Sequence, residues 1–123
     1  MKILIVEDQP IIAMDLELII EEAGHEVIGL ASDRNEALSL AHLADAAFVD
    51  CRLRDGGTGP ETARILADRH GLAVFHVTGS REMVPEEDMG SVMGVIDKPY
   101  SLGSIIEALE IADASMGAAK LIA

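Results

Sequence analysis

The sequence predicts a single α/β domain built on a doubly wound, five-stranded parallel sheet. Short apolar runs alternate five times with segments of helical spacing along the 123 residues. The middle runs are continuously apolar, as strands covered on both faces are. Right-handed crossovers between such strands place helices on both faces of the sheet. We expect the strand order 2-1-3-4-5, one of the common orders for sheets of this type.

The five strands are expected at the apolar runs. These cover residues 2–6, 25–30, 46–49, 74–77 and 92–96. Helices are expected between them, where apolar residues recur three and four positions apart. Pro10 begins the first helix, because a proline in the first turn loses no hydrogen bond, and Gly24 ends it. Asp33 and Glu36 form the pattern of a capping box at the start of the second helix, and Pro60 begins the third.

The segment 81–90 differs from the other connections between strands. Pro85 interrupts any helix there, and the segment has few large apolar residues to anchor it. We therefore expect the stretch from Gly79, a flexible residue, to Gly90 to be mobile or irregular in the free protein. After the fifth strand, Ser101 caps a long last helix. Residues 1–118 are assigned to the domain, and residues 119–123 to a C-terminal tail.

Composition and charge argue against several classes of protein. One cysteine cannot form an internal disulfide, which suits a reducing cytoplasm. No apolar run approaches the roughly 20 residues of a transmembrane helix, and acidic residues follow the first run too closely for a signal peptide. The net charge of −13 repels phosphate backbones. We expect a cytoplasmic domain that binds neither a membrane nor nucleic acid directly.

Polar side chains stand at the point where four of the strands end. Because the carboxyl ends of parallel strands meet at one edge of the sheet, we expect these side chains to lie close together. They are Glu7, Asp8, Asp50, Thr78 and Lys98. Carboxylates are ligands that Mg²⁺ prefers, and an ammonium group and a hydroxyl stabilise charge on a phosphoryl group. The residues therefore predict a site that holds a divalent cation against a phosphoryl group.

This pattern resembles the receiver domain of two-component response regulators, the CheY-like family, whose fold is the flavodoxin-like (β/α)5 sandwich. The resemblance covers residues 1 to about 118. It implies that Asp50 accepts a phosphoryl group from a histidine kinase or a histidine phosphotransfer protein. It also implies that Thr78 and Lys98 hold phosphoryl oxygens. The domain would then be a regulatory switch that catalyses only its own phosphorylation and dephosphorylation.

The resemblance also implies a set of ligands for Mg²⁺. Asp8 would bind the ion directly, with Glu7 assisting through water, beside the phosphoacceptor Asp50. The backbone carbonyl of Arg52 would complete the protein ligands. The Lys98-Pro99 peptide bond is expected to be cis, as it is in the family.

The chain departs from the usual family pattern at three positions. Gly79 stands where an alanine is usual, and Ser80 stands where a Thr-Gly-Tyr branch of alphaproteobacterial-type receivers, which this chain resembles, has tyrosine. Val95 occupies a position where many receivers carry an aromatic switch residue. The signal therefore cannot leave through a swinging ring. We expect an unknown output protein to read the surface formed by residues 79–90, the fifth strand and the last helix.

Two other functions use similar parts. A haloacid-dehalogenase-like phosphatase also carries Asp, Thr and Lys on strand ends, but it needs a second Asp where this chain has Arg52. A non-phosphorylated interaction module could keep the fold, although it would not need an intact site. Nearby, Cys51 is expected to be a small buried hydrophobic residue and His76 a hydrogen-bonded core residue. The glycine-rich run at 56–59 lacks the ending of a P-loop and indicates a flexible turn.

Overall fold

The five predicted strands form one parallel sheet in the order β2-β1-β3-β4-β5, which confirms the predicted topology. The computed structural model describes the backbone of residues 1–122 and the side chains of residues 1–117. The strands are β1 (Lys2–Val6), β2 (Glu26–Ala31), β3 (Ala46–Val49), β4 (Ala73–Thr78) and β5 (Gly94–Asp97). Their limits agree with the apolar runs to within two residues.

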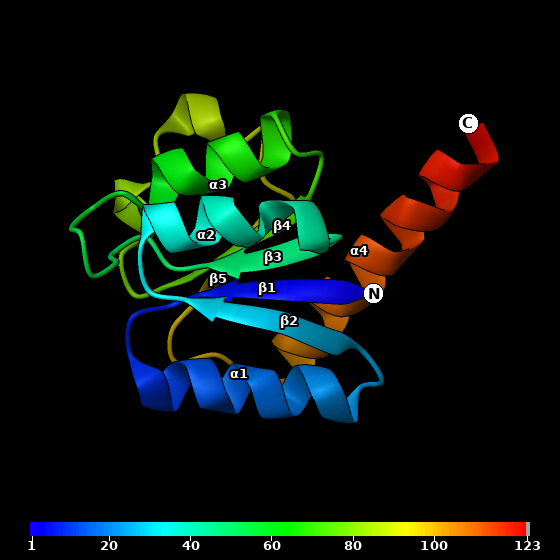
Figure 1. Ribbon diagram of the computed structural model, residues 1–123, viewed down its shortest axis with the longest axis horizontal. Helices are drawn as coiled ribbons and strands as arrows, with labels where there is room; N and C mark the ends of the chain where they lie inside the picture. Colours follow the sequence, from blue (N-terminus) through cyan, green and yellow to red (C-terminus); the bar gives the residue numbers. More distant parts are fainter. Residues whose placement is uncertain (123) are drawn as a thin grey trace.

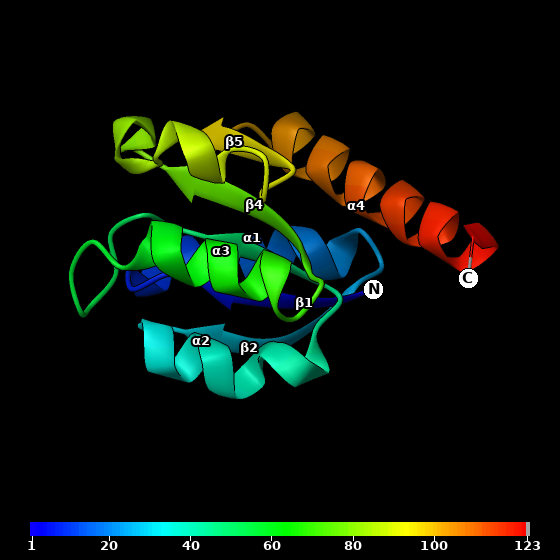
Figure 2. The same cartoon turned by 90° about the horizontal axis from the view of Figure 1, so that it is seen from above.

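Helices cover both faces of the sheet (Figures 1 and 2). The helices are α1 (Pro10–Glu22), α2 (Arg34–Leu40), α3 (Gly59–Asp68) and α4 (Leu102–Ile122). Figure 1 shows α1 on one side of the sheet and α2 and α3 on the other, with the end of α4 extending beyond the sheet. No helix among residues 1–122 combines the length and the apolar character needed to cross a bilayer.

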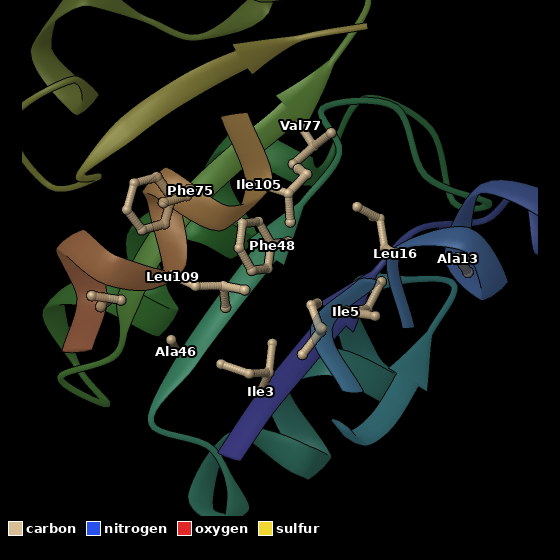
Figure 3. Packing of buried hydrophobic residues seen from close by; sticks show 14 residues of the cluster. Ile3, Ile5, Ala13, Leu16, Ala46, Phe48, Phe75, Val77, Ile105 and Leu109 are labelled. Carbon is tan, nitrogen blue, oxygen red and sulfur yellow. The ribbon is translucent and has the colours of Figure 1, made fainter. Parts of the chain in front are cut away.

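Each face of the sheet has its own core, because successive side chains of a strand point to opposite faces. Ile3 and Ile5 of β1 pack with α1 and α4, whereas Leu4 and Val6 pack with α2 and α3. On the α1–α4 face, the stacked rings of Phe48 and Phe75 lie 5.7 Å apart between centroids (Figure 3). The uninterrupted apolar run of β1 is thus explained by burial on both faces.

Four of the predicted helix ends are confirmed by their position, backbone geometry or hydrogen bonds. Pro10 is the first residue of α1, and Gly24 follows that helix with a φ of 93°, which favours glycine. Asp33 caps α2 by accepting a hydrogen bond from the backbone N–H of Glu36 at 2.9 Å. Ser101 caps α4 in the same way, with its Oγ 3.1 Å from the N–H of Ser104.

The fourth connection of the (β/α)5 pattern contains no α-helix. Two short 3₁₀-helices, η2 (Arg81–Met83) and η3 (Glu86–Asp88), lie there and are separated by Pro85. This confirms the expectation of an irregular segment. A third 3₁₀-helix, η1 (Ala41–Leu43), extends α2.

The helix α4 continues to Ile122, so the residues assigned to a tail are helical up to that point. Residue 123 lies outside the described part of the chain, and the domain limit at residue 118 stays a prediction.

The start of α3 packs directly against the turn that follows β3. A Cβ atom on Gly59 would lie 1.9 Å from the carbonyl oxygen of Asp50 and 2.5 Å from the Cα of Cys51. The N–H of Gly59 also donates a hydrogen bond to the Cys51 carbonyl at 3.0 Å. Only glycine allows the helix to approach the backbone of Asp50 so closely.

We predict that Gly59→Ala lowers the free energy of unfolding by about 2 kcal/mol or more, because the added methyl group must displace backbone atoms. Urea denaturation of both proteins measures the difference. Gly90→Ala is the matched control, since a Cβ atom there meets nothing within 4 Å. Equal unfolding free energies for the two variants would contradict the packing argument.

Candidate functional site

The carboxyl ends of the strands bring the predicted site residues to one edge of the sheet. Val6 pairs with Val49 across β1 and β3, so Glu7 and Asp50 follow these strands side by side. On the other side of β3, Lys98 follows directly after β5. Its Nζ lies 2.6 Å from Oε1 of Glu7 and 2.9 Å from Oδ2 of Asp50. One ammonium group thus bridges two carboxylates that are 43 residues apart in sequence, by subtraction of their residue numbers.

This bridge is largely removed from water. The side chains of Glu7 and Asp50 are 2% and 7% exposed, and that of Lys98 is 18% exposed. Burial, together with the charge of Asp50, raises the pKa of Glu7 to about 7, although the hydrogen bond from Lys98 opposes the shift. Burial alone would lower the pKa of Lys98, but its hydrogen bonds to the two carboxylates outweigh that effect and raise it. Lys98 is therefore a permanent cation at this edge.

Asp8 joins the other two acidic residues in a cluster. Carboxylate oxygens of Glu7, Asp8 and Asp50 all lie within 4.8 Å of one another. Three carboxylates face the single ammonium group of Lys98, so the cluster has an excess of negative charge when they are ionised. Oxygen donors at this density suit a hard divalent cation such as Mg²⁺.

Hydrogen bonds to both its backbone and its side chain fix the position of Asp50. Its Oδ1 accepts a hydrogen bond from the backbone N–H of Cys51 at 2.7 Å, while Oδ2 faces Lys98. Its own N–H donates to the carbonyl oxygen of Val6 at 2.9 Å, which fixes the turn against β1. The carboxylate therefore has a defined orientation at the end of β3.

Thr78 ends β4 at the same edge and is fully buried. Its Oγ1 accepts a hydrogen bond from the N–H of Ser80 at 2.9 Å. Its carbonyl oxygen accepts one from the N–H of Lys98 at 2.9 Å, so the backbones of these two residues are joined. Within residues 1–117, no hydrogen bond links the Thr78 hydroxyl to Asp50, Glu7 or the Lys98 side chain.

Arg52 lies in the loop after β3, and its side chain is exposed. Its Nε donates a hydrogen bond to Oγ of Ser80 at 3.1 Å, which joins the loops after β3 and β4. Among the described residues, no hydrogen bond is made to the Arg52 carbonyl oxygen.

Three further sequence expectations are confirmed at or beside the site. His76 is 1% exposed, and its Nδ1 lies 2.9 Å from the carbonyl oxygen of Val49. Burial lowers the pKa of His76 and raises that of the Cys51 thiol, so both groups are neutral near pH 7. The Lys98-Pro99 peptide bond is cis, as expected.

Three features of the site were missed by reasoning from sequence. Gly59 belongs to a run interpreted as a flexible turn, whereas it provides a close backbone contact. The guanidinium group of Arg81 binds both carboxylate oxygens of Asp97, with two distances of 3.0 Å. The hydroxyl of Tyr100 donates a hydrogen bond to the carboxylate of Asp15 on α1. The two side-chain contacts join residues far apart in sequence, and no local pattern marks them.

Comparison with known proteins identifies relatives of the same kind. Residues 3–110 match the sequence profile of the response regulator receiver domain. The phyllosphere-induced regulator PhyR of Methylorubrum extorquens is 33% identical over 107 residues, which are 85% of this chain and 40% of that protein. The transcriptional regulatory protein PdtaR of Mycobacterium tuberculosis is 32% identical over 117 residues, or 90% and 56% of the two chains. The chain thus spans about half the length of these curated relatives.

Solved structures agree with the fold. The solution structure of the PhyR receiver domain from Erythrobacter litoralis has a TM-score of 0.81 at 24% identity and covers 90% of this chain and 88% of that one. The crystal structure of a CheY-like receiver domain protein from Methanospirillum hungatei has a TM-score of 0.78 at 26% identity, with 94% and 96% covered. With its sheet order, its acidic edge and this sequence match, the chain belongs to the response regulator receiver domain family of two-component signalling.

Proposed function

We propose that this domain is a phosphorylation-dependent switch that accepts a phosphoryl group on Asp50 from a histidine kinase or a histidine phosphotransfer protein. The contact that carries the proposal is the one between Lys98 and Asp50, because it places a cation where the phosphoryl oxygens would arrive. The single cysteine, Cys51, is buried and forms no disulfide, which suits the cytoplasm as the place of action. An output protein would read the resulting change of state.

The chemistry follows from the orientation of Asp50. A carboxylate oxygen of Asp50 attacks phosphorus and forms an acyl phosphate, while the bond from phosphorus to the donor histidine nitrogen breaks and that nitrogen keeps the electron pair. Phosphoryl transfer spreads negative charge over the equatorial oxygens. Lys98 is close enough to exchange its contact with Oδ2 for one with a phosphoryl oxygen. Thr78 is buried at the same edge and supplies a hydroxyl donor.

Mg²⁺ is the cofactor that the acidic cluster would hold. Receiver domains bind this ion at an acidic pocket, and the cluster provides three carboxylates for one ammonium group. We assign Asp8 and Asp50 as ligands, with Glu7 assisting and the Arg52 carbonyl completing the set. When bound, the ion supplies positive charge that offsets the repulsion between the carboxylate and the incoming phosphoryl group.

The alternative phosphatase of the haloacid-dehalogenase type lacks support. Its general acid would stand two residues after the nucleophile, where Arg52 instead donates a hydrogen bond to Ser80. Receiver domains are regulatory proteins and not enzymes of the ordinary kind.

Phosphorylation of Asp50 is tested directly by intact mass. Incubation with acetyl phosphate and Mg²⁺ should add the mass of one phosphoryl group, and Asp50→Asn should abolish most of that addition. Asp113→Asn on α4 is the matched control, because it removes an exposed carboxylate distant from the site. Equal labelling of Asp50→Asn and the control would show that the phosphoacceptor lies elsewhere. A protein that is never labelled would be the interaction module instead.

Magnesium binding should depend on Asp8 and on pH. We expect Asp8→Ala to weaken Mg²⁺ binding by tenfold or more, measured by calorimetry, and Mg²⁺ to raise the melting temperature of the native chain. Because the pKa of Glu7 is about 7, binding should strengthen between pH 6 and pH 8 as its proton is lost. Without Mg²⁺, the free energy of unfolding should fall as pH rises from about 4.5 to 7, since the unfolded carboxyl ionises first. Unchanged affinity in Asp8→Ala would refute the ligand assignment.

The segment 79–90 is proposed to carry the signal outward. Val84 is the one buried side chain within it, so few contacts hold it in place and its local stability should be low. The 3₁₀-helix η2 is tied to β5 by the exposed side chain of Arg81, which pairs with Asp97 and donates a hydrogen bond to the Val95 carbonyl oxygen at 3.0 Å. With Gly79 next to Thr78, an inward movement of Thr78 would reach this segment first.

Hydrogen exchange measures that response. With Mg²⁺ and beryllofluoride, a mimic of the phosphoryl group, protection should rise in residues 79–90. The same addition to Asp50→Asn is the control and should change nothing there. If protection rises only around α1 and α2, the signal leaves the domain by another route.

A further inference from the structure

Tyr100 links the turn that carries Lys98 to the helix α1. It stands two residues after Lys98, and its ring packs against the core on the α1–α4 face of the sheet. Its hydroxyl donates a hydrogen bond to the carboxylate of Asp15, which lies in the second turn of α1. This contact spans 85 residues of sequence and joins the last part of the domain to the first.

The backbone of the turn at Lys98 is also tied to the sheet. The N–H of Lys98 donates to the carbonyl oxygen of Thr78 at 2.9 Å, which fixes the turn to the sheet. On the side of α1, an open cleft of about 490 Å³ separates the helix from the turn, and Ile12, Asp15, Lys98, Pro99 and Tyr100 line it. Among the described residues, the hydrogen bond to Asp15 is the one polar contact that crosses this cleft.

The helix on the far side of the cleft starts immediately after the acidic pair. Pro10 is the first residue of α1, and Glu7 and Asp8 precede it by three and two positions. A contact between α1 and the turn therefore sets how far Lys98 stands from Glu7. The Lys98 Nζ must reach Glu7 and Asp50 at 2.6 and 2.9 Å, so a small displacement of its backbone would break the bridge.

We propose that Tyr100 and Asp15 are positioning residues for phosphoryl transfer, an inference that rests on the proposed function: their hydrogen bond holds the Lys98 turn so that the ammonium group meets Asp50. Burial of the hydroxyl, followed by its hydrogen bond to Asp15, raises the pKa of Tyr100. The hydroxyl therefore stays protonated and remains a donor at every pH at which the domain acts. Tyr100 touches neither the phosphoryl group nor the cation in this role.

The experiment compares Tyr100→Phe, which keeps the ring, with Asp15→Ala, which removes the acceptor. Glu22→Ala is the matched control, because it removes a carboxylate from the exposed end of the same helix. The rate of phosphoryl addition is measured at increasing acetyl phosphate concentration with saturating Mg²⁺. We expect the maximal rate of phosphoryl addition to fall roughly tenfold in both variants, because a misplaced Lys98 ammonium group stabilises the transition state less well. The acetyl phosphate concentration that gives half of the maximal rate should change little. The double variant should lose no more than either single one.

A second readout reports the position of Lys98 without any phosphoryl transfer. In nuclear magnetic resonance spectra of the metal-free protein, the Lys98 ammonium signal should shift in Tyr100→Phe and Asp15→Ala and stay in place in Glu22→Ala. Unchanged signals and rates in Tyr100→Phe would overturn the proposal, as would additive losses in the double variant. If the ammonium signal shifts in the two variants but the wild-type chain takes up no phosphoryl group, the positioning contact is supported and the proposed function is refuted. The positioning role of Tyr100 and the proposed phosphorylation of Asp50 can therefore be refuted independently.

Discussion

The ammonium group of Lys98 between Glu7 and Asp50 is the interaction on which the rest of the site depends. Two carboxylates that are almost excluded from water repel each other strongly, and removing one partner from a buried charge pair is costly. The lysine lowers that repulsion, but one cation cannot balance three acidic residues. Burial, with a smaller contribution from the charge of Asp50, raises the pKa of Glu7 in spite of the hydrogen bond from Lys98. The edge therefore remains an acceptor for added positive charge, and that property is what a cation and a phosphoryl group can use together.

The sheet makes this cluster possible because it sets which strand ends are neighbours. With β1, β3, β4 and β5 adjacent and parallel, residues that follow these strands must share one edge, however far apart they lie in sequence. Close packing then fixes the details. The helix α3 approaches the turn after β3 so closely that only a glycine fits at position 59. This packing leaves the backbone of the site little room to change, and it holds the Asp50 carboxylate in one orientation.

Much of the fold and of the candidate site could be predicted from sequence, because the signals for strand ends and helix caps are local. A strand that ends at Asp50, a proline at the start of α1 and a capping Asp33 each leave a mark within a few residues, and each was found as expected. The contacts of Arg81 with Asp97 and of Tyr100 with Asp15 leave no such mark, since the partners lie 16 and 85 residues apart. The sequence also indicated that residues 81–90 would be irregular, but not that they form two 3₁₀-helices, because the local preferences on either side of Pro85 are weak.

The hydrogen bonds around Thr78 explain how a signal could leave the site without an aromatic switch. Thr78 Oγ1 accepts from the N–H of Ser80, whose Oγ in turn accepts from Arg52, so one hydroxyl ties together the loops after β3 and β4. If Thr78 turns its hydroxyl toward a phosphoryl oxygen, the N–H of Ser80 loses its acceptor and the link to Arg52 loosens. The remaining ties of this loop to β5 come from Arg81. Its guanidinium group pairs with Asp97, the two side chains being 50% and 62% exposed, and it donates a hydrogen bond to the Val95 carbonyl oxygen at 3.0 Å. Exposed pairs contribute about 1 kcal/mol or less, so the loops can rearrange at small cost.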